Sequence, residues 1–192
     1  MTTASDVRHN EGESTSSRLA INRLGMWLFI LSESMLFGGL LMVRFSLLGT
    51  FTHEELSQIT GLIITAILLL SSFTAYRAER SMGNGDVPST ERYLMLTLGL
   101  GAIFTAGVAF EWYEALGAFP PSTLFGSVFF TMTGLHAFHV IGGLVIIAIV
   151  YGRVRRNDFT SSDSWPVEAS VKYWHFVDVV WVFFYPALYL LN

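Results

Sequence analysis

The chain has 192 residues and a net charge of −4, and 52% of its residues are hydrophobic while only 14% are charged. A soluble domain of this length typically carries about a quarter charged residues, so the composition excludes an ordinary soluble protein. The sequence has no cysteine, which excludes disulfides, thiolate metal sites and iron–sulfur clusters. Together with a mean hydropathy of +0.52, these properties predict a small helical membrane protein.

Residues 1–18 form a polar N-terminal segment that contains no apolar run. Because such a segment buries too little apolar surface to offset the entropy of ordering, we predict a disordered tail. The missing apolar run also excludes a cleavable signal peptide within this segment. The remaining residues, 19–192, are predicted to form a single membrane domain.

Five apolar stretches follow the tail, each near the ~20 residues that cross a bilayer. The connections between them are short and rich in Gly, Pro, Ser, Asp and Asn, so they leave no room for a separate domain. We therefore predict an all-α, polytopic bundle of five transmembrane helices. The predicted spans are 24–47, 56–76, 93–112, 125–151 and 173–191.

Lys and Arg residues mark alternate connections between these spans. Every basic residue except Arg44 precedes the first span, or lies between the second and third or between the fourth and fifth. The positive-inside rule then places the N-terminus in the cytoplasm and the C-terminus outside. The basic residues used are Arg8, Arg18, Arg23, Arg77, Arg80, Arg92, Arg153, Arg155, Arg156 and Lys172.

The first and third predicted spans carry carboxylic acids. Glu33 lies ~14 Å from the inner end of the first span, where an ionised carboxylate is costly unless it faces protein or water. Two interpretations stay open for it, a carboxyl held neutral or hydrogen-bonded by burial, and a proton-linked role. Glu111 and Glu114 end the third span beside Trp112, at the membrane interface, and we interpret them as solvated.

Polar residues gather on one face of the fourth span and on one face of the fifth. His136 and His139 share a face of the fourth, while His175 and Asp178 share a face of the fifth with large polar-edged aromatic residues. Such a face predicts close contact with a partner helix or subunit. The aromatic residues are Trp174, Trp181 and Tyr185. The buried polar network that we predict consists of Glu33, His136, His139, His175 and Asp178.

A metal or haem site would need several of these side chains to converge. Di-iron bundles use Glu-x-x-His motifs, and none occurs in this sequence. The expected depths run from ~8 Å for Asp178 to ~22 Å for His136, which is too wide for one coordination sphere. We therefore expect no catalytic residue and no bound metal in this chain, and a hydrogen-bonded network instead. No patch for nucleic acid is recognisable.

The apolar stretches also carry motifs that resemble those of subunit III of the haem-copper respiratory oxidases. WLFILSE resembles the family motif with a carbodiimide-reactive carboxylate, which would be Glu33 here. LLLSSFTAY and LGAIFTAGVAFEWYEA resemble the next two family segments, and GSVFFTMTGLHAFHVIGG resembles the fourth, including both histidines. YWHFVDVVW is similar to the C-terminal motif. The motifs are collinear and cover nearly all of residues 25–191. Mitochondrial and many bacterial members have seven helices, and the first two have no counterpart here, so the resemblance is to the five-helix form.

This resemblance implies a non-catalytic subunit in a bacterial cytoplasmic membrane. Such a subunit packs on subunit I, stabilises the complex and supports proton uptake and sustained turnover. Haem and copper would then belong to partner subunits, with no cofactor in this chain beyond bound phospholipid. Arg153 and Arg156 match positions that contact lipid phosphates in the family, and arginine at the cytoplasmic interface suits anionic head groups. The expected partners are subunit I above all, then subunit II, a small subunit IV and membrane phospholipids.

Two alternatives remain at this stage. Within the same fold, the chain could be the accessory membrane subunit of a nitric oxide reductase. From a different class, it could be a stand-alone membrane metalloenzyme or a proton-coupled carrier. Metal analysis and a transport assay in vesicles separate the last two. The lack of a strong internal repeat counts against a carrier built from two related halves.

Overall fold

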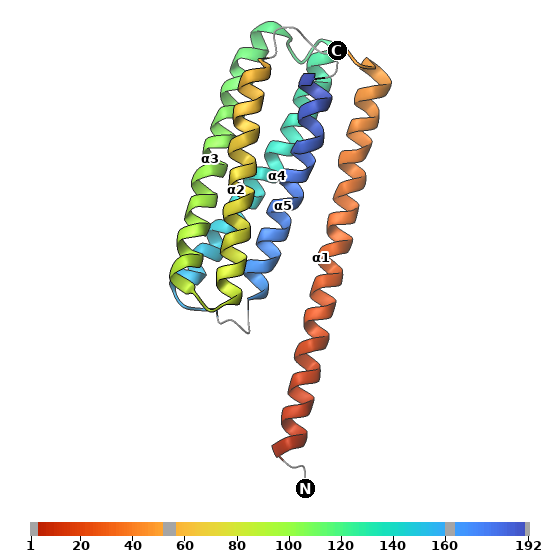
Figure 1. The fold of residues 1–192 in the computed structure, drawn as a ribbon. Coiled ribbons are helices and arrows are strands. Elements are labelled where there is room, and N and C mark those ends of the chain that lie inside the picture. Colours follow the sequence, from red (N-terminus) through yellow and green to blue (C-terminus); the bar gives the residue numbers. More distant parts are fainter. Residues whose placement is uncertain (1–3, 52–56, 160–163, 191–192) are drawn as a thin grey trace. The chain divides into compact units, whose positions relative to one another are not determined.

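The computed structural model describes residues 4–51, 57–159 and 164–190, with side chains from Ser17 onward. These residues are almost entirely helical, and no strand occurs among them (Figure 1). The all-α helical fold predicted from the sequence is therefore confirmed. The elements are α1 (Ala4–Leu48), α2 (Gln58–Gly83), α3 (Val87–Ala118), α4 (Leu124–Arg155), α5 (Trp165–Tyr185) and a closing π-helical turn, η2 (Pro186–Leu190).

The chain divides into two compact units, Met1–Leu36 and Phe37–Asn192. The first contains most of α1, including residues 4–18, whose predicted disorder stays a prediction. The second contains the last turns of α1, all the later helices and the apolar core. The arrangement of helices described below concerns this second unit alone.

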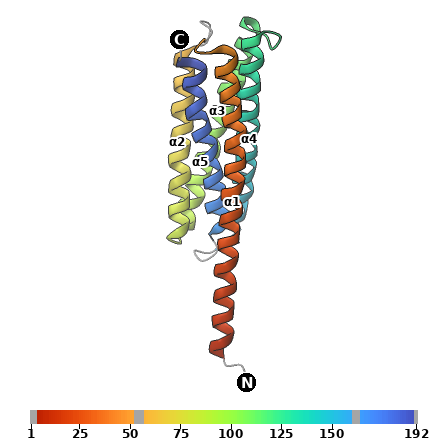
Figure 2. The same ribbon diagram turned by 90° about the vertical axis from the view of Figure 1, so that its right-hand side faces the viewer.

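The helices α2, α3, α4 and α5 form an antiparallel ring. The helices α3 and α4 each pack against the one before them, and α5 packs against both α4 and α2, which closes the ring (Figures 1 and 2). Consecutive long helices joined by short connections are expected to pack side by side in this way. As a consequence, the end of the chain lies along α2, far from it in sequence.

By length and composition, four described segments could cross a membrane: Ser17–Leu48, Gln58–Gly83, Val87–Ala118 and Leu124–Arg155. Four of the five predicted spans therefore coincide with long apolar helices. The fifth helix begins at Trp165 rather than at Tyr173. Its additional N-terminal turns contain Glu168 and Lys172, so these charged residues belong to α5 in addition to Asp178. Because of these charges, α5 is not one of the four segments named above. Most of its side chains are nevertheless buried against α2 and α4.

Polar side chains begin three of the helices at the expected places. Ser57, Asp86 and Thr123 each accept a hydrogen bond from a backbone N–H in the first turn, at 3.2, 3.1 and 3.0 Å. These N-caps satisfy donors that have no partner within the helix. Between α2 and α3, Gly85 adopts a φ of +75°, which glycine tolerates without strain. The result is a tight connection with antiparallel neighbours.

Arg44 is the one basic residue that departs from the alternating pattern, and the structure gives its role. Its side chain is fully buried, and its guanidinium donates to the carbonyl oxygens of Gly49 at 3.0 Å and Phe51 at 2.5 Å. These carbonyls follow the end of α1, where backbone acceptors lack helical partners. Arg44 therefore caps the C-terminus of α1, and its position does not indicate the orientation of the chain in the membrane.

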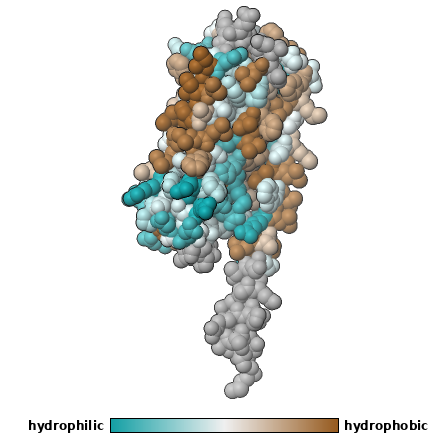
Figure 3. All heavy atoms as spheres, viewed as in Figure 1, coloured by the Kyte–Doolittle hydropathy of each residue, from teal (hydrophilic) through white to brown (hydrophobic). Residues whose placement is uncertain are grey.

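The other basic residues of the second unit lie near one end of the bundle. The α2–α3 connection, the end of α4 and the start of α5 meet there, and Figure 3 shows a hydrophilic surface over this end. Arg155 pairs across it with Glu91, with 3.2 Å between Nε and Oε1. Apolar side chains gather over the middle of the face in view, as expected for helices that contact lipid.

Candidate functional site

The seam between α2 and α5 holds His175 and Asp178 of the predicted polar network, together with the predicted aromatic residues of α5. Trp174, Asp178, Trp181 and Tyr185 on α5 are all buried, so the predicted polar and aromatic face is indeed a packed face. The opposite side of α5 is also largely buried, because α4 covers it. The main partner of the polar face within this chain is α2.

Two indole groups on α5 donate hydrogen bonds to hydroxyls on α2. Trp174 Nε1 lies 3.0 Å from Ser71 Oγ, and Trp181 Nε1 lies 2.9 Å from Thr65 Oγ1. Each hydroxyl donates its own proton to a carbonyl one turn earlier in α2, at 2.6 Å in both cases. Its lone pairs are therefore left to accept from the indole. The sequence analysis identified the tryptophans but missed these hydroxyl acceptors.

His175 and Asp178 lie beside this pair of contacts, on the outer side of the seam. His175 Nδ1 is 2.6 Å from the hydroxyl of Ser72. The Ser72 hydroxyl is also close to Asp178, but neither Asp178 oxygen has a hydrogen-bond partner of good geometry among the described residues. A groove of about 420 Å³ runs above both side chains. Its remaining lining is apolar or aromatic apart from Ser72: Leu69, Phe73, Tyr76, Val179 and Val182.

His136 and His139 of α4 have different surroundings. The ring of His136 is enclosed by Phe104, Phe184 and Trp181, with the Trp181 centroid at 4.9 Å. Neither of its nitrogens has a hydrogen-bond partner within the described part of the chain. His139 instead shares a hydrogen bond of 2.8 Å between Nδ1 and the carbonyl of Leu135. The two histidines therefore have different surroundings although they share a helix face.

His175 and Asp178 are the two members of the predicted polar network that line the same groove. Among the described residues, His136, His175 and Asp178 are not hydrogen-bonded to one another. Glu33 belongs to the first unit, so its relation to these side chains stays a prediction. Within the described ranges, no group of three or more His, Cys, Asp or Glu side chains is arranged to hold a metal ion.

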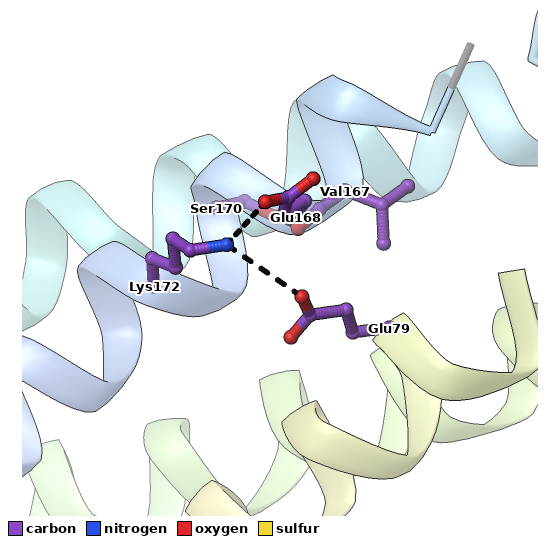
Figure 4. Close-up of polar contacts among 5 residues, drawn as sticks. All are labelled: Glu79, Val167, Glu168, Ser170 and Lys172. Carbon is purple, nitrogen blue, oxygen red and sulfur yellow. Dashed lines mark hydrogen bonds and ion pairs between the residues drawn. The ribbon is translucent and has the colours of Figure 1, made fainter. Parts of the chain in front are cut away.

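A charged cluster joins α2 and α5 at the hydrophilic end of the bundle. Lys172 contacts the carboxylate of Glu168 one turn earlier in α5, and its Nζ lies 3.8 Å from Oε1 of Glu79 on α2 (Figure 4). The sequence analysis used Lys172 only as a topology marker and did not identify the two acids. Because all three side chains are partly exposed, solvent screens the cluster and its contribution to stability is small.

The two predicted lipid-binding arginines lie at the end of α4. Arg153 Nε is 3.8 Å from Asp158 Oδ2, and its guanidinium lies over the ring of Phe159 at 4.5 Å. Arg156 is the C-cap residue of α4 and is exposed. Both side chains are at the surface near the hydrophilic end, and their binding of lipid phosphate stays a prediction.

Comparison with known proteins gives a consistent result. The family described as "Cytochrome c oxidase subunit III" matches residues 6–192. A Nocardia farcinica protein named "Probable cytochrome c oxidase subunit 3" is 34% identical over 177 residues, which cover 88% of this chain and 87% of the relative. A "Cytochrome c oxidase subunit 3" of Corynebacterium diphtheriae is 34% identical over 188 residues, with 90% and 92% covered. The protein of the same name from Xenopus laevis is 39% identical over 183 residues, with 87% of this chain but 68% of the relative covered.

Proposed function

Since the chain belongs to the cytochrome c oxidase subunit III family, we propose that it serves as the non-catalytic subunit III of a haem-copper terminal oxidase. In this role it packs on subunit I, stabilises the complex and supports proton uptake and sustained turnover. The haem and copper centres that carry out oxygen reduction belong to the partner subunits. The observation that carries the proposal is the family match over nearly the whole chain.

The groove between α2 and α5 supports a contact with another membrane subunit. Its rim is apolar, which suits a transmembrane helix, and the buried carboxyl of Asp178 lies at its floor without a partner of good geometry among the described residues. A buried polar group that lacks a partner costs roughly 1–3 kcal/mol. A helix of subunit I that carries a hydrogen-bond donor would remove that cost.

The proposed location is a bacterial cytoplasmic membrane, crossed five times with the N-terminus inside and the C-terminus outside. Arg77 and Arg80 near the end of α2, Arg92 near the start of α3 and Arg155 at the end of α4 support this orientation. With these helix ends in the cytoplasm, Arg153 and Arg156 lie where anionic head groups of bound phospholipid are within reach. The fifth crossing is α5, whose charged residues lie mostly in its first turns.

The names of the relatives favour this function over the nitric oxide reductase alternative. All those given above are described as subunits of cytochrome c oxidase. The further partners in the proposal are subunit II and a small subunit IV. The donor of electrons, cytochrome c or quinol, is determined by a site on those other subunits.

The proposal is tested by purifying the tagged chain from its native membrane in mild detergent and recording the optical spectrum and metal content of the eluate. We expect a large subunit and haem-copper absorbance to co-elute and to be lost when a harsher detergent strips the partners. A chain that elutes alone and retains stoichiometric iron or copper would contradict the proposal, because the metal would then belong to this chain.

A further inference from the structure

The groove between α2 and α5 extends along about two turns of each helix. Its lining comes from residues 69–76 of α2 and 175–182 of α5, which span about 10 Å along each helix axis. No described residue of α3, α4 or the last turns of α1 lines it. Phe37, in those last turns, packs elsewhere on α5, with its ring centroid 6.0 Å from Phe176 and 5.7 Å from Phe184. The described part of the second unit therefore leaves the groove uncovered.

Asp178 brings a buried carboxyl group to this groove. Only 3% of the residue is exposed, and neither carboxyl oxygen has a hydrogen-bond partner of good geometry among the described residues. Protonation does not remove the need for a partner, because a neutral carboxyl group still has an O–H donor and a carbonyl acceptor. Asp178 therefore lacks a partner in either protonation state, which is costly for a buried group.

The imidazole of His175 lines the same groove with one ring nitrogen available. Its Nδ1 lies 2.6 Å from the hydroxyl of Ser72, whereas its Nε2 has no hydrogen-bond partner within the described ranges and is not fully enclosed. The Ser72 hydroxyl can donate to Nδ1 or accept from it, so Nε2 can serve as an acceptor or as a donor. His175 can therefore adapt to the group that fills the groove.

The depth of these side chains limits what can fill the groove. Asp178 lies six residues beyond Lys172, which places it about 9 Å further along α5 from the hydrophilic end. Acyl chains offer no hydrogen bond at that depth, whereas a transmembrane helix satisfies its own backbone and can carry a polar side chain there. The apolar lining, Leu69, Phe73, Val179 and Val182, suits the apolar surface of such a helix.

We infer that a transmembrane helix of subunit I occupies this groove and presents a hydroxyl or carboxamide side chain to Asp178 and His175. The inference rests on the proposed function, since it assigns the face on which the partner subunit binds. A neutral group that both donates and accepts satisfies the carboxyl group in either protonation state. A lysine or arginine pairs only with the ionised carboxylate and would add a cation fewer than two turns from Lys172.

Photo-cross-linking of the full-length chain in its native membrane tests the location. Val179 lines the groove and Val145 lies on α4 outside it, and both are 53% exposed, so they form a matched pair. The photoreactive residue p-benzoylphenylalanine, which inserts into neighbouring C–H bonds of protein or lipid, replaces one or the other. We expect position 179 to form an adduct with a transmembrane helix of subunit I, mapped by mass spectrometry, in higher yield than position 145.

Two substitutions of Asp178 test the chemistry of the partner. Asp178→Asn keeps a donor and an acceptor, so subunit I should still co-purify with it in mild detergent. Asp178→Leu leaves the polar group of the partner unpaired and should lower the co-purified amount by at least about fivefold. Far-UV circular dichroism shows whether both variants keep their helices. If Asp178→Leu loses them, the cross-linking and Asp178→Asn decide the question.

These results are separable from the proposed function. The inference is overturned if the wild-type chain co-purifies with subunit I but position 179 forms adducts only with lipid or another subunit, or no more adduct than position 145. It is also overturned if folded Asp178→Leu retains subunit I fully, or if Asp178→Asn loses as much as Asp178→Leu, which would indicate an ionic partner. A wild-type chain that does not co-purify with an oxidase contradicts the proposed function itself, and the inference with it.

Discussion

At the scale of single residues, hydroxyl groups on α2 help to position α5 by accepting hydrogen bonds from its tryptophans. Thr65 and Ser71 each donate to their own helix and accept from a tryptophan of α5, so every polar atom in these two contacts is satisfied. These hydrogen bonds matter because lipid offers no alternative acceptor for a buried indole N–H. Asp178 and His136 differ, because neither polar atom of either side chain has a partner of good geometry among the described residues.

The contact of Trp181 with Thr65 makes a direct test of this interpretation. Thr65→Val leaves the indole N–H without an acceptor and should lower the free energy of unfolding by about 1–3 kcal/mol. Trp181→Phe removes the donor and some packing against Phe104. In a double-mutant cycle measured by denaturant unfolding in mixed micelles, we expect a coupling energy of about 0.6 kcal/mol, the typical value for interhelical hydrogen bonds in a membrane protein. Strictly additive effects would contradict a direct hydrogen bond.

At the scale of helices, small residues on α3 and α4 make room for one large side chain of α5. A Cβ atom placed on Gly101 would lie 2.8 Å from the indole ring of Trp174, and one on Gly143 would lie at the same distance from it. Glycine is therefore needed where α3 and α4 meet this ring. Of the adjacent pair Gly142 and Gly143, it is Gly143 that makes the tight contact.

Gly143→Ala and Gly142→Ala form a matched pair of variants. Gly143→Ala should lower the free energy of unfolding by about 1–3 kcal/mol, because the added methyl group overpacks the rigid indole ring. Gly142→Ala should be neutral or slightly stabilising, since its nearest neighbour, the hydroxyl of Tyr173, would lie at 3.6 Å and alanine favours helix. Thermal unfolding followed by circular dichroism compares the two. Equal destabilisation by both substitutions would contradict the interpretation that contact with Trp174 requires a glycine at position 143.

The start of α3 should make stability depend on pH. Hydrogen bonds from Ser89 lower the pKa of Asp86 below its ordinary value of 3.8. A pKa that is lower in the folded state stabilises the protein above the unfolded-state pKa, and this stabilisation is lost as the pH falls through the folded-state value. The difference in melting temperature between wild type and Asp86→Ala should therefore be constant above pH 5 and shrink below pH 4. A difference that does not change with pH would contradict an ionised cap.

At the scale of the whole molecule, the closed ring of α2 to α5 leaves its polar groups in separate places. The seam holds His175 and Asp178, the aromatic core holds His136, and the opposite ends hold the Lys172 cluster and Glu111. Among the described residues, no convergent nucleophile, acid and base arrangement is formed by these groups.

The proposed role predicts how Glu33 acts in the assembled complex. Glu33→Ala should leave the initial rate of oxygen consumption within about twofold of the wild type, because the residue touches no reacting atom under this proposal. The total number of turnovers before inactivation, or the stability of the complex, should fall. An oxygen electrode trace followed to inactivation measures both quantities, with Glu91→Gln as a control. Immediate and complete loss of activity in a fully assembled complex would contradict the proposal.

Several features of this protein are local properties of the sequence, and the sequence by itself determined them. Apolar runs of about 20 residues specify long helices, and Ser57, Asp86 and Thr123 mark where three of them begin. The basic residues of alternate connections gather at one end because consecutive helices alternate in direction. The collinear motifs were sufficient to recognise the family.

Other features depend on which helices become neighbours, and only the tertiary structure decided them. Ser71 and Trp174 are 103 residues apart, and Thr65 and Trp181 are 116 apart, so helical periodicity places each on a face but cannot pair them. The same limit explains why the different surroundings of His136 and His139, which share a helix face, were not foreseen. It also explains Glu111, which looked solvated at the end of its span but is buried and accepts a hydrogen bond from Tyr189. Pairing across a bundle is a property of the closed ring, whereas length and polarity are properties of each helix alone.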